Sequence, residues 1–177
     1  MTNIIRIGGE DYVHVGAGKE GDVYVSTDKK YVLKVYKPPL KLEKIFQEIN
    51  FLKTYETSGV VPIIYKNTES TILMEYLVGY INLKKFITMK KAYTLEQQNQ
   101  LLMNIVNARK KLGEDIFYRD MHLENILFNP ITLDIKFIDQ GMSEYQELGW
   151  LINMKKIVED LKMSRVLTGN LILKGRV

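Results

Sequence analysis

The decisive stretch of this sequence is Tyr118-Arg119-Asp120-Met121-His122-Leu123-Glu124-Asn125-Ile126-Leu127. It is followed by Asp139-Gln140-Gly141, nineteen positions after Asp120. An Asp, an Asn five residues later, an apolar strand and a hairpin back to a second Asp bring three oxygen-bearing side chains to one end of a strand. Mg²⁺ prefers hard oxygen ligands and combines one or two protein carboxylates with phosphate oxygens and water. Asn125 and Asp139 are therefore candidate Mg²⁺ ligands, and Asp120 is the candidate proton acceptor. A single Asp-x4-Asn is more often a turn or helix cap, so the phosphoryl-transfer interpretation needs support from the rest of the chain.

Length and composition indicate one domain, or two small lobes that share a core. The chain has 177 residues, 46% of them apolar, which is enough to bury a sizeable interior. The absence of cysteine excludes a disulfide scaffold and thiolate sites for metals or redox chemistry. The net charge of +4 is spread along the chain and does not indicate nucleic-acid binding. No window reaches about 18 uninterrupted apolar residues, so neither a signal peptide nor a membrane span is expected.

A glycine-rich hairpin is expected near the N-terminus. Tyr12-Val13-His14-Val15 forms one strand, and Val23-Tyr24-Val25 forms the next. Between them lie Gly16, Gly18 and Gly21. Dinucleotide-binding folds share this spacing but require a helix directly after the glycines, and here a strand follows. Glycines allow a backbone to pass close to phosphates, although a plain hairpin turn would need only one or two of the three.

Lys34 lies within the otherwise apolar strand Tyr31 to Tyr36, where an ammonium group is costly unless it meets an anion. An amphipathic helix is predicted over residues 40–55. Its apolar positions recur at helical spacing and are Leu42, Ile45, Phe46, Ile49 and Leu52. Glu48 borders this stripe and is expected to reach inward to Lys34, although a solvated helix glutamate is the plainer alternative.

Two more apolar runs, Val60 to Tyr65 and Thr71 to Tyr76, complete a predicted five-stranded antiparallel sheet. The second run exits through Met74-Glu75-Tyr76-Leu77, whose backbone could offer a C=O and an N–H to an adenine edge. Helices are expected from there on. Thr94 and Gln97 form a capping box for a helix that ends at Gly113, and another helix is predicted over residues 144–163. The expected fold class is α+β.

In this order the elements resemble the protein-kinase superfamily over about residues 12 to 141. The resemblance implies ATP as phosphate donor and Mg²⁺, replaceable by Mn²⁺, as the metal. It implies that Lys34, paired with Glu48, holds the ATP phosphates and that Asp120 orients and deprotonates the substrate hydroxyl, while Asn125 and Asp139 bind the metal. The implied nucleotide-binding positions are Gly16, Gly18, Gly21, Val23, Val32, Lys34, Met74, Glu75, Leu77 and Leu127.

Several positions depart from the family pattern. Tyr118 stands where the family usually has His, and Gln140 replaces the usual Phe after the metal-binding Asp. Only 36 residues follow Gly141, too few for a full activation segment and the usual large-lobe helices. The chain thus resembles the short atypical kinases of the RIO and Bud32 kind and, more closely, the short bacterial effector kinases of the OspG and NleH type.

That resemblance implies one minimal protein-kinase-like domain over residues 1–177. It would have an N-lobe over about 1–77, a hinge over about 74–79 and a reduced, mainly helical C-lobe over about 80–177. We expect a monomeric serine/threonine-protein kinase with a protein substrate, an activating protein partner as an option, and a cytoplasmic location, or a host-cell cytosol for a translocated effector.

Two alternatives stay open. His122 and the basic pI favour a small-molecule phosphotransferase of the aminoglycoside kind, although such enzymes usually need a larger helical lobe and an acidic substrate pocket. Gln140 and the missing segment favour a pseudokinase that binds nucleotide as a binding module. Pseudokinases usually lose Lys34, Asp120 or Asp139, and all three are present here.

Overall fold

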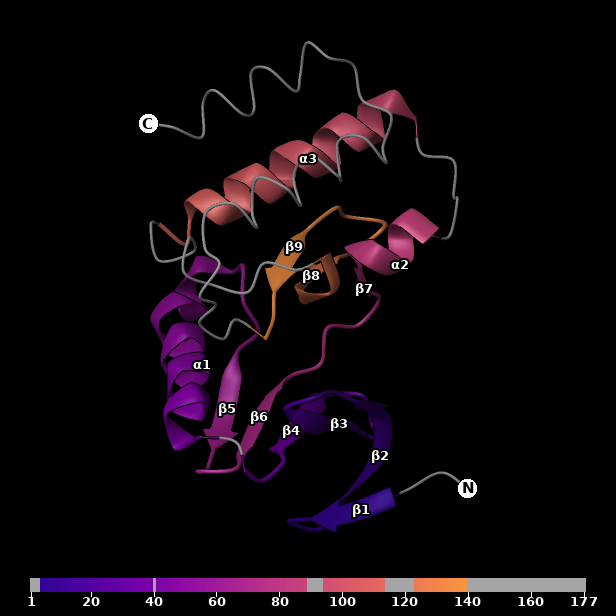
Figure 1. Cartoon of the computed structure of the whole chain (residues 1–177). Coiled ribbons are helices and arrows are strands. Elements are labelled where there is room, and N and C mark those ends of the chain that lie inside the picture. The colour runs from indigo at the N-terminus through magenta and orange to yellow at the C-terminus, as the bar shows by residue number, and fades with distance from the viewer. Residues whose placement is uncertain (1–3, 40, 89–93, 114–122, 140–177) are drawn as a thin grey trace. The chain divides into compact units, whose positions relative to one another are not determined.

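The computed structural model describes residues 4–39, 41–88, 94–113 and 123–139. The chain divides into two compact units, Met1–Val78 and Gly79–Val177, each of which contains its own sheet (Figure 1). Among the described residues, no helix combines the length and the apolar composition needed to cross a membrane.

The first unit contains a six-stranded sheet with the order β1-β2-β3-β4-β6-β5, in which all neighbours are antiparallel. The strands are β1 (Ile4–Ile7), β2 (Glu10–Ala17), β3 (Gly21–Ser26), β4 (Tyr31–Tyr36), β5 (Ile64–Asn67) and β6 (Thr71–Glu75). The prediction of five strands was one short, because β1 pairs with β2 through a tight turn at Gly8 and Gly9, whose φ values of 60° and 90° suit glycine.

The strand predicted over Val60 to Tyr65 was also placed too early. It begins at Ile64 and not at Val60. Val60 and Val61 are 4% and 0% exposed although they lie outside any strand. Their apolar character therefore reflects burial in the core and not strand pairing, two causes that a short apolar run does not separate.

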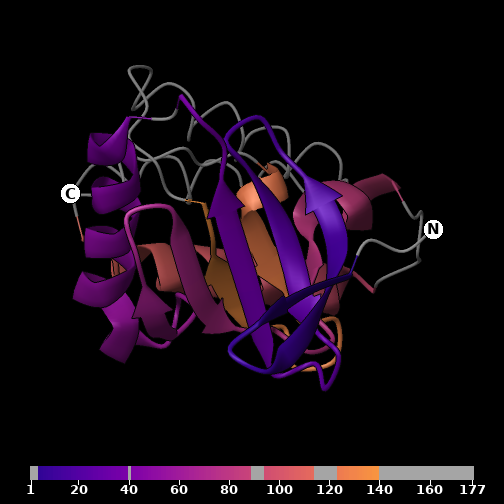
Figure 2. The same ribbon diagram turned by 90° about the horizontal axis from the view of Figure 1, so that it is seen from below.

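Helix α1 (Leu42–Tyr55) packs on one face of this sheet. Figures 1 and 2 show it alongside the end of the sheet formed by β5 and β6. Ile45 and Ile49 join Tyr36, Ile72 and Met74 in one buried cluster. The α+β fold class is confirmed, since an antiparallel N-terminal sheet packs with a helix.

The buried stripe of α1 differs from the predicted one at its edge. Leu42 and Phe46 are 50% and 47% exposed, whereas Phe51 is 1% exposed. With 3.6 residues per turn, the buried arc runs from Phe51 through Glu48 and Leu52 to Ile49. Leu42 and Phe46 lie just beyond the Ile49 side of that arc.

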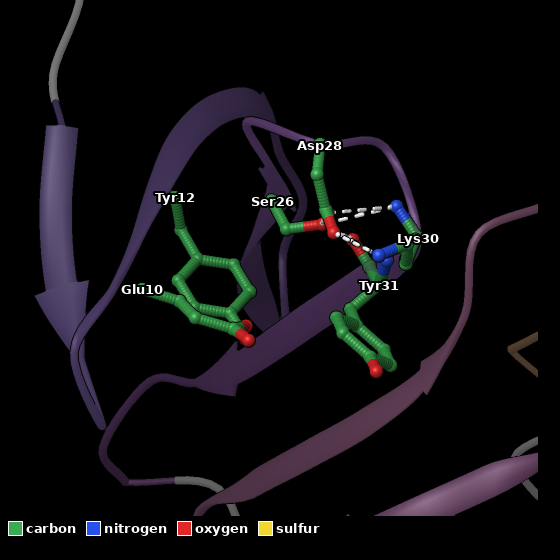
Figure 3. Close-up of polar contacts among 6 residues, drawn as sticks. All are labelled: Glu10, Tyr12, Ser26, Asp28, Lys30 and Tyr31. Carbon is green, nitrogen blue, oxygen red and sulfur yellow. Dashed lines mark hydrogen bonds and ion pairs between the residues drawn. The ribbon is translucent and has the colours of Figure 1, made fainter.

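The turn between β3 and β4 is fixed by a buried hydroxyl (Figure 3). Ser26, 3% exposed, accepts the backbone N–H groups of Lys30 and Tyr31 at 3.2 and 3.0 Å and donates to Asp28 Oδ1 at 2.7 Å. Lys30 Nζ in turn lies 3.1 Å from Asp28 Oδ2. The Lys30 carbonyl accepts the Tyr76 N–H at 3.0 Å, so this turn also holds the exit of β6.

The described residues of the second unit form a small antiparallel sheet and two helices. The sheet has the order β7-β8-β9, with β7 (Ile81–Asn82), β8 (Ile126–Phe128) and β9 (Ile135–Phe137). Around it are α2 (Leu83–Thr88), α3 (Leu95–Lys110) and the 3₁₀ turn Leu123–Asn125. In Figure 1, α3 runs along β8 and β9, and α2 lies beside β7.

Helix α3 begins as predicted and ends at Lys110, three residues before the predicted stop at Gly113. The Thr94 hydroxyl accepts the Gln97 N–H at 3.2 Å, and Gln97 Oε1 accepts the Thr94 N–H at 3.0 Å, which is a capping box. Gly113 follows with a φ of 59°, which suits glycine after a helix. The core of the unit comprises Leu83, Phe86, Leu101, Leu102, Ile105, Ala108, Leu112, Leu123, Ile126, Phe128, Ile135 and Phe137. The helix predicted over residues 144–163 lies outside the described residues.

Candidate functional site

Lys34 and Glu48 form a buried ion pair between β4 and α1. Lys34 Nζ lies 3.0 Å from Glu48 Oε1 and 2.8 Å from Oε2, and the two side chains are 9% and 4% exposed. Removing two charges from water is expensive, and close two-point contact of this kind is what offsets that cost. The contact expected from the sequence is therefore present, at the centre of the first unit's core.

Tyr36 adds a third member to this pair. Its hydroxyl donates to Glu48 Oε2 at 2.5 Å, and Lys34 Nζ lies 4.8 Å from the centroid of its ring. Tyr36 is 6% exposed. No sequence pattern indicated this role. The available signal was its position two residues after Lys34, since residues i and i+2 of a strand point to the same face.

The glycine-rich turn between β2 and β3 is closed by a hydrogen bond from the Gly18 N–H to the Gly21 carbonyl at 2.7 Å. A Cβ at Gly21 would lie 2.5 Å from the Val35 carbonyl, so glycine is required there for β3 to approach β4. A Cβ at Gly16 would meet nothing within 4 Å, and one at Gly18 would make only ordinary contact. Packing within the chain thus explains Gly21 and leaves Gly16 and Gly18 without a structural reason among the described residues.

Lys37 links this turn to the end of β4, a contact that no sequence pattern predicted. Its Nζ lies 2.7 Å from Asp22 Oδ1, and its N–H donates to the Glu20 carbonyl at 2.9 Å. The hydrogen bond from Lys37 holds the pKa of Asp22 below its ordinary value. His14 Nε2 lies 3.6 Å from the same carboxylate oxygen. The turn is therefore anchored at its base while Gly18 at its tip is exposed.

Three predicted nucleotide-binding residues share the sheet face of Lys34. Val23 is paired directly with Lys34, and Val32 is paired with Met74. Directly paired residues of antiparallel strands point to the same face. Val23 and Val32 are half-buried, and Met74 is 8% exposed. The register thus brings an apolar set next to the buried ammonium.

The backbone after β6 includes an N–H group for which the described residues provide no acceptor. The N–H groups of Glu75 and Tyr76 donate to the carbonyls of Ile63 and Lys30 at 2.9 and 3.0 Å. Among the residues that the structure describes, the Leu77 N–H has no acceptor. Such a backbone donor, three residues after the buried Met74, suits a ligand with a hydrogen-bond acceptor on a flat apolar ring.

In the second unit the structure brings Asn125 and Asp139 together. The Ile138 N–H donates to the Asn125 carbonyl at 3.0 Å, and Asn125 Nδ2 donates to the Asp139 carbonyl at 3.3 Å. Asp139 has a φ of 53°, in the left-handed region that Asp tolerates better than most residues. The contact thus joins the Asn125 amide to the Asp139 backbone, and amide and carboxylate oxygens are ligands of the kind that Mg²⁺ prefers.

Leu127 lies between these two residues in the sequence and on the exposed side of β8. Its strand neighbours Ile126 and Phe128 are both 0% exposed, whereas Leu127 is half-buried and paired with Lys136. Within the described ranges no cluster of three or more His, Cys, Asp or Glu residues could hold a metal ion. Asp120 and its neighbours Tyr118 and His122, as well as Gln140, lie outside the described residues.

A comparison with protein-family models matches residues 10–161 to the protein kinase domain. This chain belongs to the protein kinase domain family. The matched span of this kinase domain includes Lys34, Glu48, Asp120, Asn125 and Asp139. Kinases of this family are phosphotransferases that typically use ATP and Mg²⁺. The search of curated proteins gave no match.

Proposed function

We propose that the chain is a minimal serine/threonine-protein kinase that acts as one domain over residues 1–177. Its N-lobe would cover about 1–77, its hinge about 74–79 and its C-lobe about 80–177. It would transfer the γ-phosphoryl group of ATP to a Ser or Thr hydroxyl of a protein, and it would lack a full activation segment. Its motifs resemble those of the OspG and NleH type of bacterial effector kinase and those of the RIO and Bud32 kind.

The buried Lys34–Glu48 pair is the observation that carries this proposal. A buried ion pair contributes little net stability compared with apolar residues of the same volume, so its presence calls for another role. The Lys34 ammonium lies on the same sheet face as Val23 and Val32, two of the proposed nucleotide-binding residues. Lys34 would hold the phosphates of ATP, and this contact would strengthen as charge develops on the transferred group.

The rest of the nucleotide site is assigned by the same reasoning. The backbones of Gly16, Gly18 and Gly21 would cover the phosphates, and the open space around the first two supports this. Adenine would bind the Leu77 N–H and the Glu75 carbonyl. The apolar residues around its ring would be Val23, Val32, Met74 and Leu127.

Asn125 and Asp139 would hold Mg²⁺, or Mn²⁺ in its place, and their oxygen atoms fit this role. Bound Mg²⁺ neutralises charge on the phosphate oxygens. Asp120 would accept the proton of the substrate hydroxyl while that oxygen bonds to the γ-phosphorus and the bond from phosphorus to ADP breaks. The three acidic or amide side chains thus divide into one proton acceptor and two metal ligands.

A protein acceptor is favoured over a small molecule because residues 10–161 match the protein kinase domain. An activating protein partner remains part of the proposal, as do a monomeric state and a cytoplasmic location, or a host cytosol for an effector. Neither nucleic acid nor a membrane is among the proposed partners.

The test is phosphate transfer from labelled ATP with Mg²⁺ to a cell lysate and, separately, to a panel of aminoglycosides. Lys34→Met keeps an unbranched side chain of similar length and removes the charge. Lys66→Met is the matched control, since Lys66 lies on β5 and is exposed. We expect label in protein bands with the wild type and with Lys66→Met, and at least about 100-fold less with Lys34→Met, as for loss of one preorganised charge contact.

Label in an aminoglycoside alone would support the small-molecule phosphotransferase instead. Nucleotide binding by calorimetry without transfer to any acceptor would support the pseudokinase. Equal transfer by wild type and Lys34→Met, with a large loss of melting temperature in the variant, would show that Lys34 is only structural and would refute its assignment.

A further inference from the structure

Glu48 makes more contacts than an ion pair with Lys34 requires. Both of its oxygens face Lys34 Nζ, and Oε2 also accepts the Tyr36 hydroxyl at 2.5 Å. Glu48 is 3% exposed, so each of these bonds replaces a bond to water. A buried carboxylate that loses a partner bears the full desolvation cost. The tyrosine hydroxyl therefore determines how well Glu48 tolerates any movement of Lys34.

Tyr36 is itself held firmly. Its N–H donates to the Ser70 carbonyl at 2.9 Å. It is also paired with Gly21 on β3, the glycine whose missing Cβ permits close contact of the two strands. Its ring belongs to the buried cluster that includes Ile45 and Ile49, which flank Glu48 on α1. The hydroxyl is thus presented to α1 from a strand that is bonded on both sides.

The ring of Tyr36 also acts on Lys34. Nζ lies 4.8 Å from the ring centroid, within the range over which an aromatic face attracts a cation. When Lys34 turns part of its hydrogen-bonding capacity toward a phosphate, the ring continues to stabilise the ammonium and the hydroxyl continues to bond Glu48. Tyr36 is placed to keep both charged groups in position during that exchange.

We propose that Tyr36 is a positioning residue, which fixes Glu48, and through Glu48 fixes Lys34, by linking β4 to α1 with a second bond. This inference rests on the proposed function, because it concerns the alignment of Lys34 for phosphate. In this proposal, contacts within the chain itself hold α1 against β4.

The experiment compares Tyr36→Phe, which removes only the hydroxyl, with Tyr24→Phe. Tyr24 lies on the adjacent strand β3, is paired with Leu33 and so faces the other side of the sheet. We expect Tyr36→Phe to lower kcat about tenfold, as loss of a bond to a charged group allows, with the KM for ATP changed less than threefold. Tyr24→Phe should leave both constants unchanged.

Two further measurements separate positioning from general stability. In a Glu48→Ala background, Tyr36→Phe should have no additional effect on kcat, since the two residues then no longer interact. Independently of activity, acylation of each lysine by an amine-directed reagent, quantified by mass spectrometry, should rise several-fold at Lys34 in Tyr36→Phe. Acylation at the exposed Lys66 should not change.

Tyr36→Phe indistinguishable from Tyr24→Phe in both kcat and Lys34 acylation would overturn the proposal. So would an equal loss of kcat with and without Glu48. If Glu48→Ala does not fold, the kcat values and Lys34 acylation rates of Tyr36→Phe and Tyr24→Phe decide whether Tyr36 is a positioning residue. If the wild type transfers no phosphate but Tyr36→Phe still raises Lys34 acylation, the kinase function fails while the positioning by Tyr36 stands.

Discussion

The Lys34–Glu48 pair and the Asn125–Asp139 pair are both close contacts between residues with proposed roles, but different atoms join them. Lys34 and Glu48 meet through two charged side chains, each at least nine-tenths buried. Asn125 and Asp139 are half-buried, and their contact runs from the Asn125 amide to the backbone carbonyl of Asp139 at 3.3 Å, not to its carboxylate. The first pair is joined by charge, the second by backbone geometry.

The difference indicates how each pair is organised before ligand arrives. Charges in the first pair neutralise each other, and Tyr36 adds a third bond, so the chain alone defines this arrangement. In the second pair the left-handed φ of Asp139 and the Ile138 N–H fix the backbone. A divalent cation would then bring the two side-chain oxygens to one point, since metal binding and local order are coupled. We expect removal of one partner to lower the free energy of unfolding more in the first pair than in the second. Metal affinity should instead depend on the second pair.

The largest expected effect concerns the acidic residues. Asp139→Asn should weaken Mg·ATP binding, because a neutral amide replaces a negative charge facing a divalent cation. Asp120→Asn should leave that affinity nearly intact and lower kcat by about 10²–10⁴, as for loss of a general base. Calorimetry of nucleotide binding and phosphate transfer, measured on the same preparations, test both expectations.

Circular dichroism serves as the control, since both variants should stay folded. An equal loss of ATP binding in the two variants would contradict the division of roles. It would also contradict the proposed difference between the Lys34–Glu48 and Asn125–Asp139 pairs, because metal binding would then not distinguish Asp139 from Asp120.

The second prediction concerns stability and tests the first pair. Glu48→Gln removes the carboxylate charge that contacts the buried Lys34 ammonium and should lower the free energy of unfolding by about 3–5 kcal/mol. Asn125→Ala removes one hydrogen bond from a half-buried site and should cost only about 1 kcal/mol. Urea unfolding of both variants measures the difference. Similar losses in the two would show that the pairs do not differ in the way proposed.

The sequence predicted the first pair for a simple physical reason. A lysine in an apolar strand requires an anion, and helical spacing placed Glu48 at the edge of the apolar stripe. The same reasoning did not find Tyr36, because a tyrosine in an apolar strand is already explained by burial of its ring. Only the structure shows its hydroxyl directed at Glu48.

Other misses have comparable causes. Strand β1 was overlooked because Ile4 to Ile7 is short, and its pairing depends on the conformation of Gly8 and Gly9. The start of β5 was misplaced because Val60 and Val61 are buried without being paired. Spacing alone identified Asn125 and Asp139 as neighbours, but it could not show that the contact uses a backbone oxygen.

The third prediction uses a second tyrosine–carboxylate contact as a contrast to Tyr36. Tyr12, 3% exposed, donates to Glu10 Oε2 at 3.1 Å, as seen in Figure 3, where the two side chains lie together. Burial, followed by the hydrogen bond to Glu10, raises the pKa of Tyr12 to about 12. The folded state therefore holds this proton more tightly than the unfolded state, whose tyrosine titrates near 10.

The sign follows from proton linkage. The stabilisation is fully present below about pH 10 and is lost as the pH rises toward 12, because the folded protein then binds more protons than the unfolded chain. We expect the free energy of unfolding to fall by roughly 1–2 kcal/mol more in wild type than in Tyr12→Phe over this range, with allowance for solvent screening. Parallel pH profiles of the two proteins would contradict this account.

The smallest expected effect is that of phosphorylation. Lys34 and Glu48 are in contact in the unmodified chain, and the Tyr36 hydroxyl bonds to the same Glu48 carboxylate. No phosphate is therefore needed to hold α1 in position. The hydroxyl-bearing residues that follow Gly141 most closely are Ser143 and Tyr145, which lie outside the described residues. Treatment of active protein with a phosphatase, verified by intact mass, should leave kcat within about twofold of the untreated value. A strong loss of transfer after removal of phosphate would mean that order in the first pair depends on a modified segment. The contrast between a self-organised pair and a ligand-organised pair would then no longer hold.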